Sequence, residues 1–146
     1  MTPTQIALVQ DSFRSVLPIR DEAAAIFYRR LFTIDPALKP LFSHAEMADQ
    51  GRKLMAALAF VVNGLGEPEV IVGTVRTLAR RHVAYGVRVE HYASVGRALI
   101  ETLEEGLGDA FRLPVRDAWL AAYATLSDIM IAAATETVGS HRVPCS

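Results

Sequence analysis

The sequence predicts an all-α protein that forms a single domain, residues 1–146. Apolar residues recur at spacings of three and four along nearly the whole chain, which is the period of a helix with one buried face. No segment alternates apolar and polar residues over a useful strand length, and no internal repeat is present. A chain of 146 residues suffices for one domain that buries roughly 70% of the surface its unfolded chain exposes. We therefore expect six or seven helices joined by short corners.

The first helix is predicted from a cap at its start. Thr2 can cap the helix, Pro3 then occupies its first position, and Gln5 closes a capping box. Pro18 ends this helix, because proline lacks the N–H that a continuing helix needs.

The second and third helices have similar boundary signals. Asp21 can cap the second helix, which ends in "DPALKPLF", where two prolines predict a short turn of helix and a corner. Asp49 can cap the third helix, whose apolar stripe begins at Leu54 and is stopped by Gly64.

The fourth helix places a histidine where an apolar residue is expected. Its stripe carries Ile71, Val75 and Leu78, continues with His82, and ends at Gly86. Two longer helices follow, roughly residues 90–107 and 114–138, and residues 139–146 form a tail.

Composition excludes several classes of partner. The net charge is −1 and the 21% of charged residues mix both signs, so neither nucleic acid nor an acidic membrane is favoured. The N-terminus lacks the pattern of a signal peptide, and the longest uninterrupted apolar run is short for a membrane span. We expect a cytoplasmic protein. Cys145 is the single cysteine, so no internal disulfide or cysteine metal cluster can form.

Two interpretations of His82 are open from the residues alone. The first is a core histidine whose ring nitrogens bond to a backbone carbonyl or a side chain. The second is a metal ligand, since imidazole is the commonest protein ligand for transition metals. Zinc lacks support, because the chain has no H-E-x-x-H motif and its histidines have no mutual ligand spacing. Haem iron needs only one axial histidine on an apolar surface.

Three other residues fit a haem pocket, although each also has an ordinary interpretation. Gln50 lies one turn before Leu54, so it is either a pocket residue or an exposed residue of a first helical turn. Tyr28 has apolar neighbours one turn away on both sides, so its hydroxyl faces a ligand or bonds to backbone. Phe42 covers a cofactor or fills a gap between helices.

Taken in order, these residues resemble a globin, in particular the single-domain bacterial haemoglobins of the Vitreoscilla type and the haem domain of flavohaemoglobins. The resemblance covers nearly the whole chain, and its motifs are "FYRRLF", "P-x-L-K-P-L-F", "Q-G-R-K-L", "R-R-H-x-x-Y-G-V", "H-Y-x-x-V-G" and "D-A-W-L-A-A-Y". It implies the globin fold, with six to eight helices packed around a haem pocket, and one haem b in each chain.

The resemblance also implies roles for individual residues. It makes His82 the iron ligand, with Tyr28 and Gln50 as the polar pair on the opposite, distal side. The residues that it places around the haem are Phe42, Leu54, Arg81, Val87 and Val95. It gives Tyr92 and Glu136 the support of the histidine, where a carboxylate behind the imidazole raises its basicity.

The function implied is reversible oxygen binding together with detoxification of nitric oxide by dioxygenation. The expected ligands are oxygen, nitric oxide and carbon monoxide. Flavohaemoglobins continue into a reductase, whereas this sequence has no G-x-G-x-x-G motif, so we expect turnover to need a separate flavin reductase. Two alternatives remain: an oxygen carrier or gas sensor without turnover, and a haem-free globin-like interaction module. We expect a monomer or a homodimer.

Overall fold

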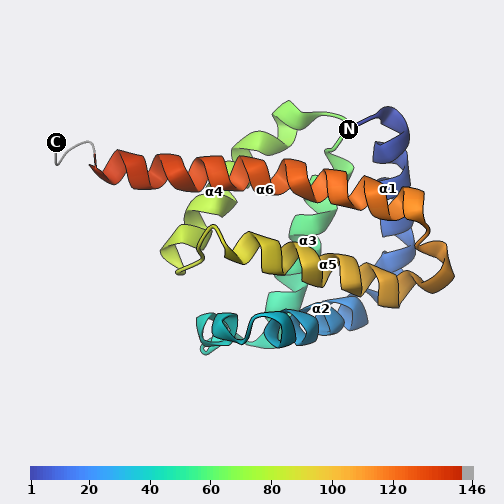
Figure 1. Ribbon diagram of the computed structural model, residues 1–146, viewed down its shortest axis with the longest axis horizontal. Helices are drawn as coiled ribbons and strands as arrows, with labels where there is room; N and C mark the ends of the chain where they lie inside the picture. The colour runs from blue at the N-terminus through green and yellow to red at the C-terminus, as the bar shows by residue number, and fades with distance from the viewer. Residues whose placement is uncertain (143–146) are drawn as a thin grey trace.

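The computed structural model describes the backbone of residues 1–142 and the side chains of residues 1–135. Within this range the chain forms six α-helices, three short 3-10 helices and no strand, which confirms the all-α prediction (Figure 1). The elements are α1 (Pro3–Val16), η1 (Leu17–Ile19), α2 (Arg20–Ile34), η2 (Pro36–Phe42), α3 (Met47–Asn63), α4 (Pro68–Ala84), α5 (His91–Leu107), η3 (Gly108–Ala110) and α6 (Leu113–Arg142).

The helices pack in crossed pairs. In Figure 1, α6 runs across the molecule in front of α1 and α4, and it packs on both of them. The helix α5 lies beside α6, and α2 packs on α5 and on α3. As a result α3 and α4 rest on different partners: α3 lies against α2 and α1, whereas the extensive packing of α4 is on α6.

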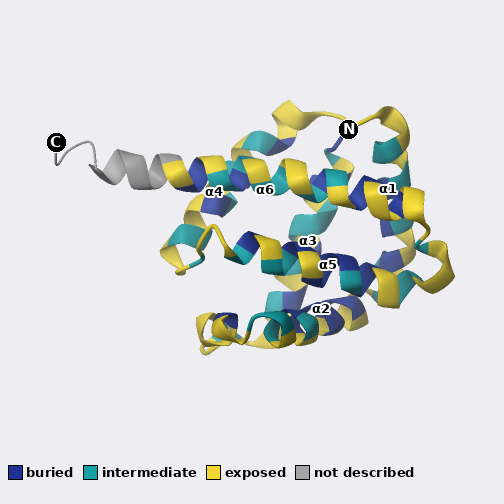
Figure 2. Ribbon diagram, viewed as in Figure 1, coloured by how far each residue is buried: buried dark blue, intermediate teal, exposed yellow. Residues whose placement is uncertain are grey.

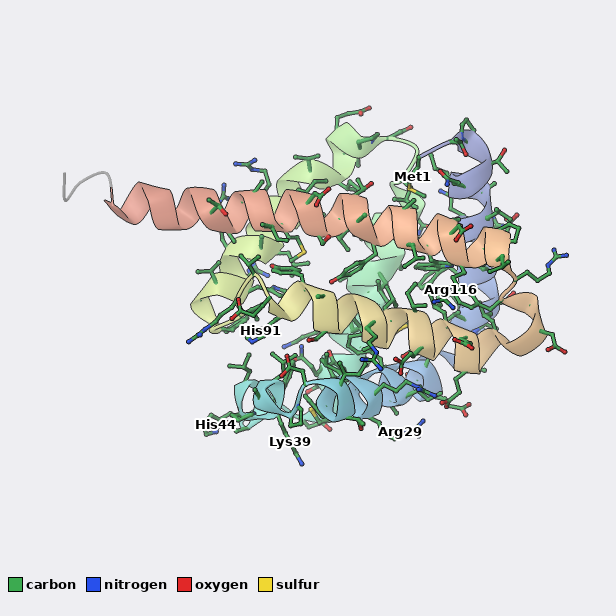
Figure 3. All side chains as sticks on the ribbon, in the orientation of Figure 1. Met1, Arg29, Lys39, His44, His91 and Arg116 are labelled. Carbon is green, nitrogen blue, oxygen red and sulfur yellow. The ribbon has the colours of Figure 1, made fainter. Side chains whose placement is uncertain are left out.

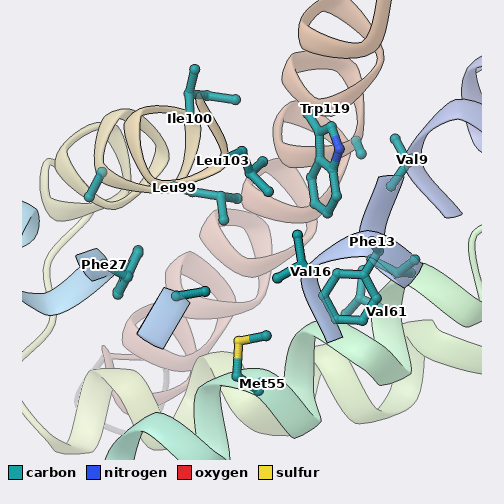
Figure 4. Packing of buried hydrophobic residues seen from close by; sticks show 14 of the residues in the cluster. Val9, Phe13, Val16, Phe27, Met55, Val61, Leu99, Ile100, Leu103 and Trp119 are labelled. Atoms are coloured by element: carbon teal, nitrogen blue, oxygen red, sulfur yellow. The ribbon is translucent and has the colours of Figure 1, made fainter. Parts of the chain in front are cut away.

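The core is continuous through the six helices, which turn their buried faces inward (Figure 2). Trp119 of α6 lies beside Phe13 of α1, with 6.3 Å between their ring centroids (Figure 4). The Nε1–H group of Trp119 donates a hydrogen bond to Ser12 Oγ at 2.8 Å. The tryptophan thus buries its large ring without leaving its donor unpaired.

The helix starts confirm one predicted cap and correct two others. Thr2 accepts from the backbone N–H of Gln5, and the capping box is complete. The prediction for Asp21 was wrong: α2 follows η1 almost directly and starts at Arg20, so Asp21 lies in its first turn. The prediction for Asp49 was also wrong, because Glu46 caps α3 through its carboxylate.

The helix ends follow the glycines. Gly64 closes α3, and Gly86 follows the last residues of α4 with a φ of 91°. A positive φ is unstrained only for glycine, which explains why the chain can turn there directly after α4. The backbone of α6 is helical as far as Arg142, beyond residue 138 where we expected the last helix to end.

One segment of the described chain, Leu113–Thr135 of α6, is by length and composition alone long and apolar enough to cross a membrane, with a mean hydropathy of 1.3. Its residues Trp119, Ala122 and Met130 are buried in the core, and α6 packs on α1 and α4. Packing buries 33% of this segment, and the core helix of a globular protein can pass the same test of length and composition.

Candidate functional site

His82 lies in the last turn of α4, half-buried at the end of the predicted stripe. Its Nδ1 is 2.8 Å from the backbone carbonyl oxygen of Leu78. A carbonyl oxygen can only accept, so Nδ1 carries the proton and Nε2 keeps its lone pair. Burial lowers the pKa of His82, and the hydrogen bond to Leu78 opposes this effect. The imidazole is therefore neutral, with Nε2 available as a metal ligand.

The corner after α4 holds the backbone around His82. The N–H of Val87 donates to the carbonyl oxygen of His82 at 2.9 Å, and the N–H of Tyr85 donates to the carbonyl oxygens of Arg81 and His82. These bonds satisfy carbonyl groups that the end of a helix leaves open. Gly86 makes the turn possible, so the sequence "HVAYGV" fixes the last turn of α4.

Tyr28 lies on the buried face of α2, with 7% of its surface exposed. Its ring packs edge-on against Phe42, with 5.4 Å between the centroids, and lies near Phe27 and Phe32. Burial raises the pKa of Tyr28, and a side-chain hydrogen bond with Gln50 acts in the opposite direction. The hydroxyl therefore stays protonated and can donate a hydrogen bond.

Gln50 is the residue whose side chain forms a hydrogen bond with Tyr28, and its predicted role beside a ligand stays a prediction. Gln50 lies in the first turn of α3 and is half-buried, and Leu54 one turn later is half-buried against the core. Two amphiphilic side chains from different helices thus meet beside an apolar wall. Such an arrangement can donate hydrogen bonds to a small polar ligand while it excludes water.

Tyr92, in the first turn of α5, is buried, and its hydroxyl has no hydrogen-bond partner among the described residues. Burial raises its pKa. A buried hydroxyl without a partner among these residues is available to donate a hydrogen bond. The side chain of Glu136, the predicted partner on α6, lies outside the described residues.

A cavity of about 240 Å³ lies between α3 and α4. Leu78 and Arg81 line it from α4, one turn before and next to His82, and Val61 and the half-exposed Phe60 line it from α3. The side chain of Arg81 is exposed to solvent. Open space thus separates α3 from α4 here, and of the predicted haem residues Arg81 alone is among the described residues that line it.

The other predicted site residues lie at the edges of the core. Phe42 contacts Tyr28 from η2, and Val87 and Val95 are half-buried and pack on the core. Their predicted roles, like those of the polar residues, stay predictions.

Sequence reasoning missed Tyr123. Its hydroxyl donates to the backbone carbonyl oxygen of Tyr92 at 2.6 Å, which joins α6 to α5. Its ring occupies the space beside Gly96, where a Cβ atom would come within 2.6 Å of Tyr123 Cε2. Burial, and to a smaller degree Tyr92, raises the pKa of Tyr123. The signal was in the sequence, since a tyrosine on the buried face of a helix needs a partner for its hydroxyl.

A family model described as Globin matches residues 25–130 of this chain. The protein therefore belongs to the globin family. Globins and flavohemoproteins bind haem, so haem is the cofactor that the family implies.

Known proteins resemble this chain in sequence and in fold. The flavohemoprotein of Bordetella pertussis is 39% identical over 107 residues, which is 72% of this chain and 27% of that protein. The chain thus spans about a quarter of the length of this curated relative. A bacterial globin from Campylobacter jejuni superposes with a TM-score of 0.85 at 24% identity, covering 94% of this chain and 99% of the other.

A third relative has the same fold. It comes from Rhodothermus marinus and is described as an engineered carbene transferase and a candidate nitric oxide dioxygenase. It has a TM-score of 0.86 at 23% identity, and the match covers 96% of this chain and 97% of that chain. At these identities the two solved structures show the fold alone.

The residues of this chain fit a haem. His82 presents a neutral imidazole with a free Nε2, which is the one protein ligand that the iron requires. The described side chains contain no group of three or more His, Cys, Asp or Glu residues that could hold a metal ion on their own. A single histidine with a free ring nitrogen suits a metal whose other ligands come from a porphyrin.

Proposed function

We propose that this chain binds one haem b through His82, binds oxygen and nitric oxide, and detoxifies nitric oxide by dioxygenation with electrons from a separate flavin reductase. The observation that carries the proposal is the hydrogen bond from His82 Nδ1 to the carbonyl oxygen of Leu78. It fixes the ring orientation and reserves Nε2 for the iron. The nitric oxide part of the proposal follows the description of the Rhodothermus marinus protein as a candidate nitric oxide dioxygenase, a protein that this chain resembles in fold.

The distal residues supply hydrogen-bond donors in a pocket from which water is excluded. A bound haem supplies an iron centre that takes diatomic gases and exchanges electrons. Tyr28 keeps its proton because burial raises its pKa, and Gln50 orients its hydroxyl. Their donors stabilise negative charge on a polar gas ligand, and this stabilisation is largest where water is excluded. Leu54 and Phe42 provide that apolar surrounding.

The proximal residues set the properties of the ligand histidine. Tyr92 brings a buried hydroxyl without a partner among the described residues, and Glu136 brings a carboxylate on α6. A hydrogen-bonded carboxylate behind the imidazole raises its basicity and favours oxygen chemistry over storage. Arg81 would pair with a propionate, and Val87 and Val95 would contact the haem edge.

The proposal is tested first by haem uptake. We expect the wild-type chain to take up one equivalent of haem with a sharp Soret band, and His82→Ala to hold it weakly or not at all. Added imidazole should partly restore binding to His82→Ala, because it can occupy the vacated space. His44→Ala is the matched control, since His44 is exposed after η2, and it should bind haem normally. Unchanged haem binding by His82→Ala would show that another residue is the ligand.

The second test separates turnover from carriage. The haem-loaded chain with a generic flavin reductase and reductant should consume nitric oxide in the presence of oxygen and produce nitrate. Reversible oxygen binding without nitric oxide consumption would reduce the function to that of a carrier or sensor. If the protein shows no absorption spectrum of bound haem, the remaining alternative is a haem-free globin-like interaction module.

A further inference from the structure

The 3-10 helix η2 connects the two sides of the candidate site. At its end, the ring of Phe42 packs edge-on against Tyr28 and against Phe32, in both cases with 5.4 Å between the centroids. The preceding residue, Leu41, reaches the corner after α4, where a Cβ on Gly86 would lie 3.4 Å from Leu41 Cδ2. Gly86 comes four residues after His82, so η2 touches both the tyrosine side and the histidine side.

The internal structure of η2 does little to fix its position. Two of its residues, Pro36 and Pro40, have no backbone N–H, and of the whole segment only Leu38 is buried. Its start shows no side-chain cap. A short 3-10 helix with few hydrogen bonds has little stability of its own. Contacts from outside the segment must therefore determine where Phe42 lies.

One polar contact from another helix reaches the start of η2. The hydroxyl of Ser94 on α5 donates to Asp35 Oδ2 at 3.0 Å, in a half-buried place, across 59 positions in the sequence. Asp35 is the residue at which α2 ends and η2 begins. Figure 3 shows this side of the molecule, with Lys39 marking η2, His44 the residues just after it and His91 the start of α5. A hydrogen bond to a carboxylate is about twice as strong as one between neutral groups.

We propose that the Ser94–Asp35 hydrogen bond is a latch that holds η2, and with it Phe42, in place over the candidate site. Ser94 and Asp35 are then positioning residues: they touch neither cofactor nor ligand, and they act through the ring of Phe42. The hydrogen bond holds Asp35 at the start of η2, and η2 in turn holds the ring of Phe42 edge-on against Tyr28. That Phe42 covers a haem site rests on the proposed function, whereas the position of its ring is independent of that function.

The test compares three serine variants. Ser94→Ala removes the latch, and Ser94→Thr keeps the hydroxyl as a rescue. Ser12→Ala is the matched control, because it also removes an interhelical serine hydrogen bond, the one that Trp119 donates to, but away from η2. The first readout is the set of NOEs between the rings of Tyr28 and Phe42 in the cofactor-free protein. The second is the rate of haem transfer from the loaded protein to an apomyoglobin acceptor.

We expect Ser94→Ala to lose the Tyr28–Phe42 ring contacts and to release haem about tenfold faster. A tenfold change corresponds to the loss of one hydrogen bond to a charged group. Ser94→Thr and Ser12→Ala should keep both the contacts and the wild-type rate. The latch is refuted if Ser94→Ala keeps the ring contacts, or if Ser12→Ala speeds haem release equally. If the wild-type chain takes up no haem, the proposed function fails, and the ring contacts alone decide whether the latch exists.

Discussion

Tyr28 combines a buried hydroxyl group with a partner, Gln50, from another helix. A hydrogen bond to a partly negative ligand is worth roughly 1.5 to 3 kcal/mol, the range for bonds to charged groups. We therefore predict that Tyr28→Phe speeds oxygen dissociation from the haem-loaded protein by about one to two orders of magnitude. Carbon monoxide gains much less charge when bound, so its dissociation should change far less. Stopped-flow measurements of both gases check this.

A variant of Gln50 shows how much each residue of the pair contributes to the stabilisation of bound oxygen. Gln50→Leu should have a smaller effect on oxygen dissociation than Tyr28→Phe if the glutamine chiefly orients the tyrosine, and the double variant should be less than additive. Equal acceleration of oxygen and carbon monoxide would indicate a steric barrier rather than a hydrogen bond. No change for oxygen would remove Tyr28 from the distal site.

Tyr92 and Tyr123 differ in what their hydroxyl groups do for the fold. The hydroxyl of Tyr123 bonds to the backbone of α5, whereas the hydroxyl of Tyr92 has no partner among the described residues. We predict that Tyr123→Phe lowers the unfolding free energy of the cofactor-free chain by about 1 kcal/mol, and that Tyr92→Phe lowers it less. In the haem-loaded protein, Tyr92→Phe should lower the iron–histidine stretching frequency, because His82 loses support behind its ring.

Urea unfolding and resonance Raman spectroscopy make these two measurements. An equal loss of stability in both variants, with an unchanged Raman band in Tyr92→Phe, would make Tyr92 a structural residue.

The sequence singled out candidate site residues, but it did not show which groups these residues contact. The apolar stripe of α4 pointed to His82, because a buried imidazole needs a reason to be there. It did not show which ring nitrogen is free, since that depends on the distance to the carbonyl of Leu78. Tyr123 bonds to Tyr92, 31 positions away in the sequence, and Ser94 bonds to Asp35, 59 positions away. No local sequence pattern encodes such pairs.

At the scale of an element, α4 depends on the turn that ends it. Gly86 has a φ of 91°, and the corner that follows returns the N–H of Val87 to His82. We predict that Gly86→Ala destabilises the protein by roughly 1 kcal/mol, because a Cβ is strained at positive φ. Gly66→Ala is the control, since a Cβ there meets nothing within 4 Å and its φ is not positive. Thermal unfolding checks the pair, and equal losses would mean that the conformation of Gly86 is unimportant.

The apolar periodicity predicted the helices, but the residues at which α2 and α3 begin differ from those predicted. The chain passes from η1 into α2 with Ile19 at the cap position, so Asp21 had no end to cap. Glu46 caps α3 although aspartate and asparagine are the commoner choices, so the cap lies three residues before Asp49 and the helix starts at Met47. Helix boundaries depend on the path of the preceding loop, which packing decides.

For the whole molecule, the junction of α2 and α5 makes stability depend on pH. Arg30 bridges Glu101 and Glu105 across the two helices. The pKa of Glu101 is lowered by Arg97 and also by Arg30, and that of Glu105 by Arg30 and also by Arg29. Since folding lowers these pKa values, their contribution is present above the unfolded value of about 4.3 and is lost as the pH falls below it.

We predict that Arg30→Met weakens this loss of unfolding free energy between pH 5 and pH 3, and that about 1 M salt weakens it in the wild type. Arg20→Met is the control, because the guanidinium of Arg20 donates to the carbonyl of Leu17 and not to a carboxylate. Urea titrations across this pH range make the measurement, and an identical pH slope for Arg30→Met would exclude the junction as its origin.

An open space separates α3 from α4, and among the described elements α4 packs extensively only on α6. We therefore expect the cofactor-free chain to release α4 while α1, α2, α3, α5 and α6 stay assembled. Local opening of α4 then costs less than global unfolding, and the two free energies differ. If His82 holds the cofactor, as we propose, binding should couple α4 to the rest of the core. We then expect a single unfolding transition in the loaded protein, with insertion of the cofactor as the last step of folding.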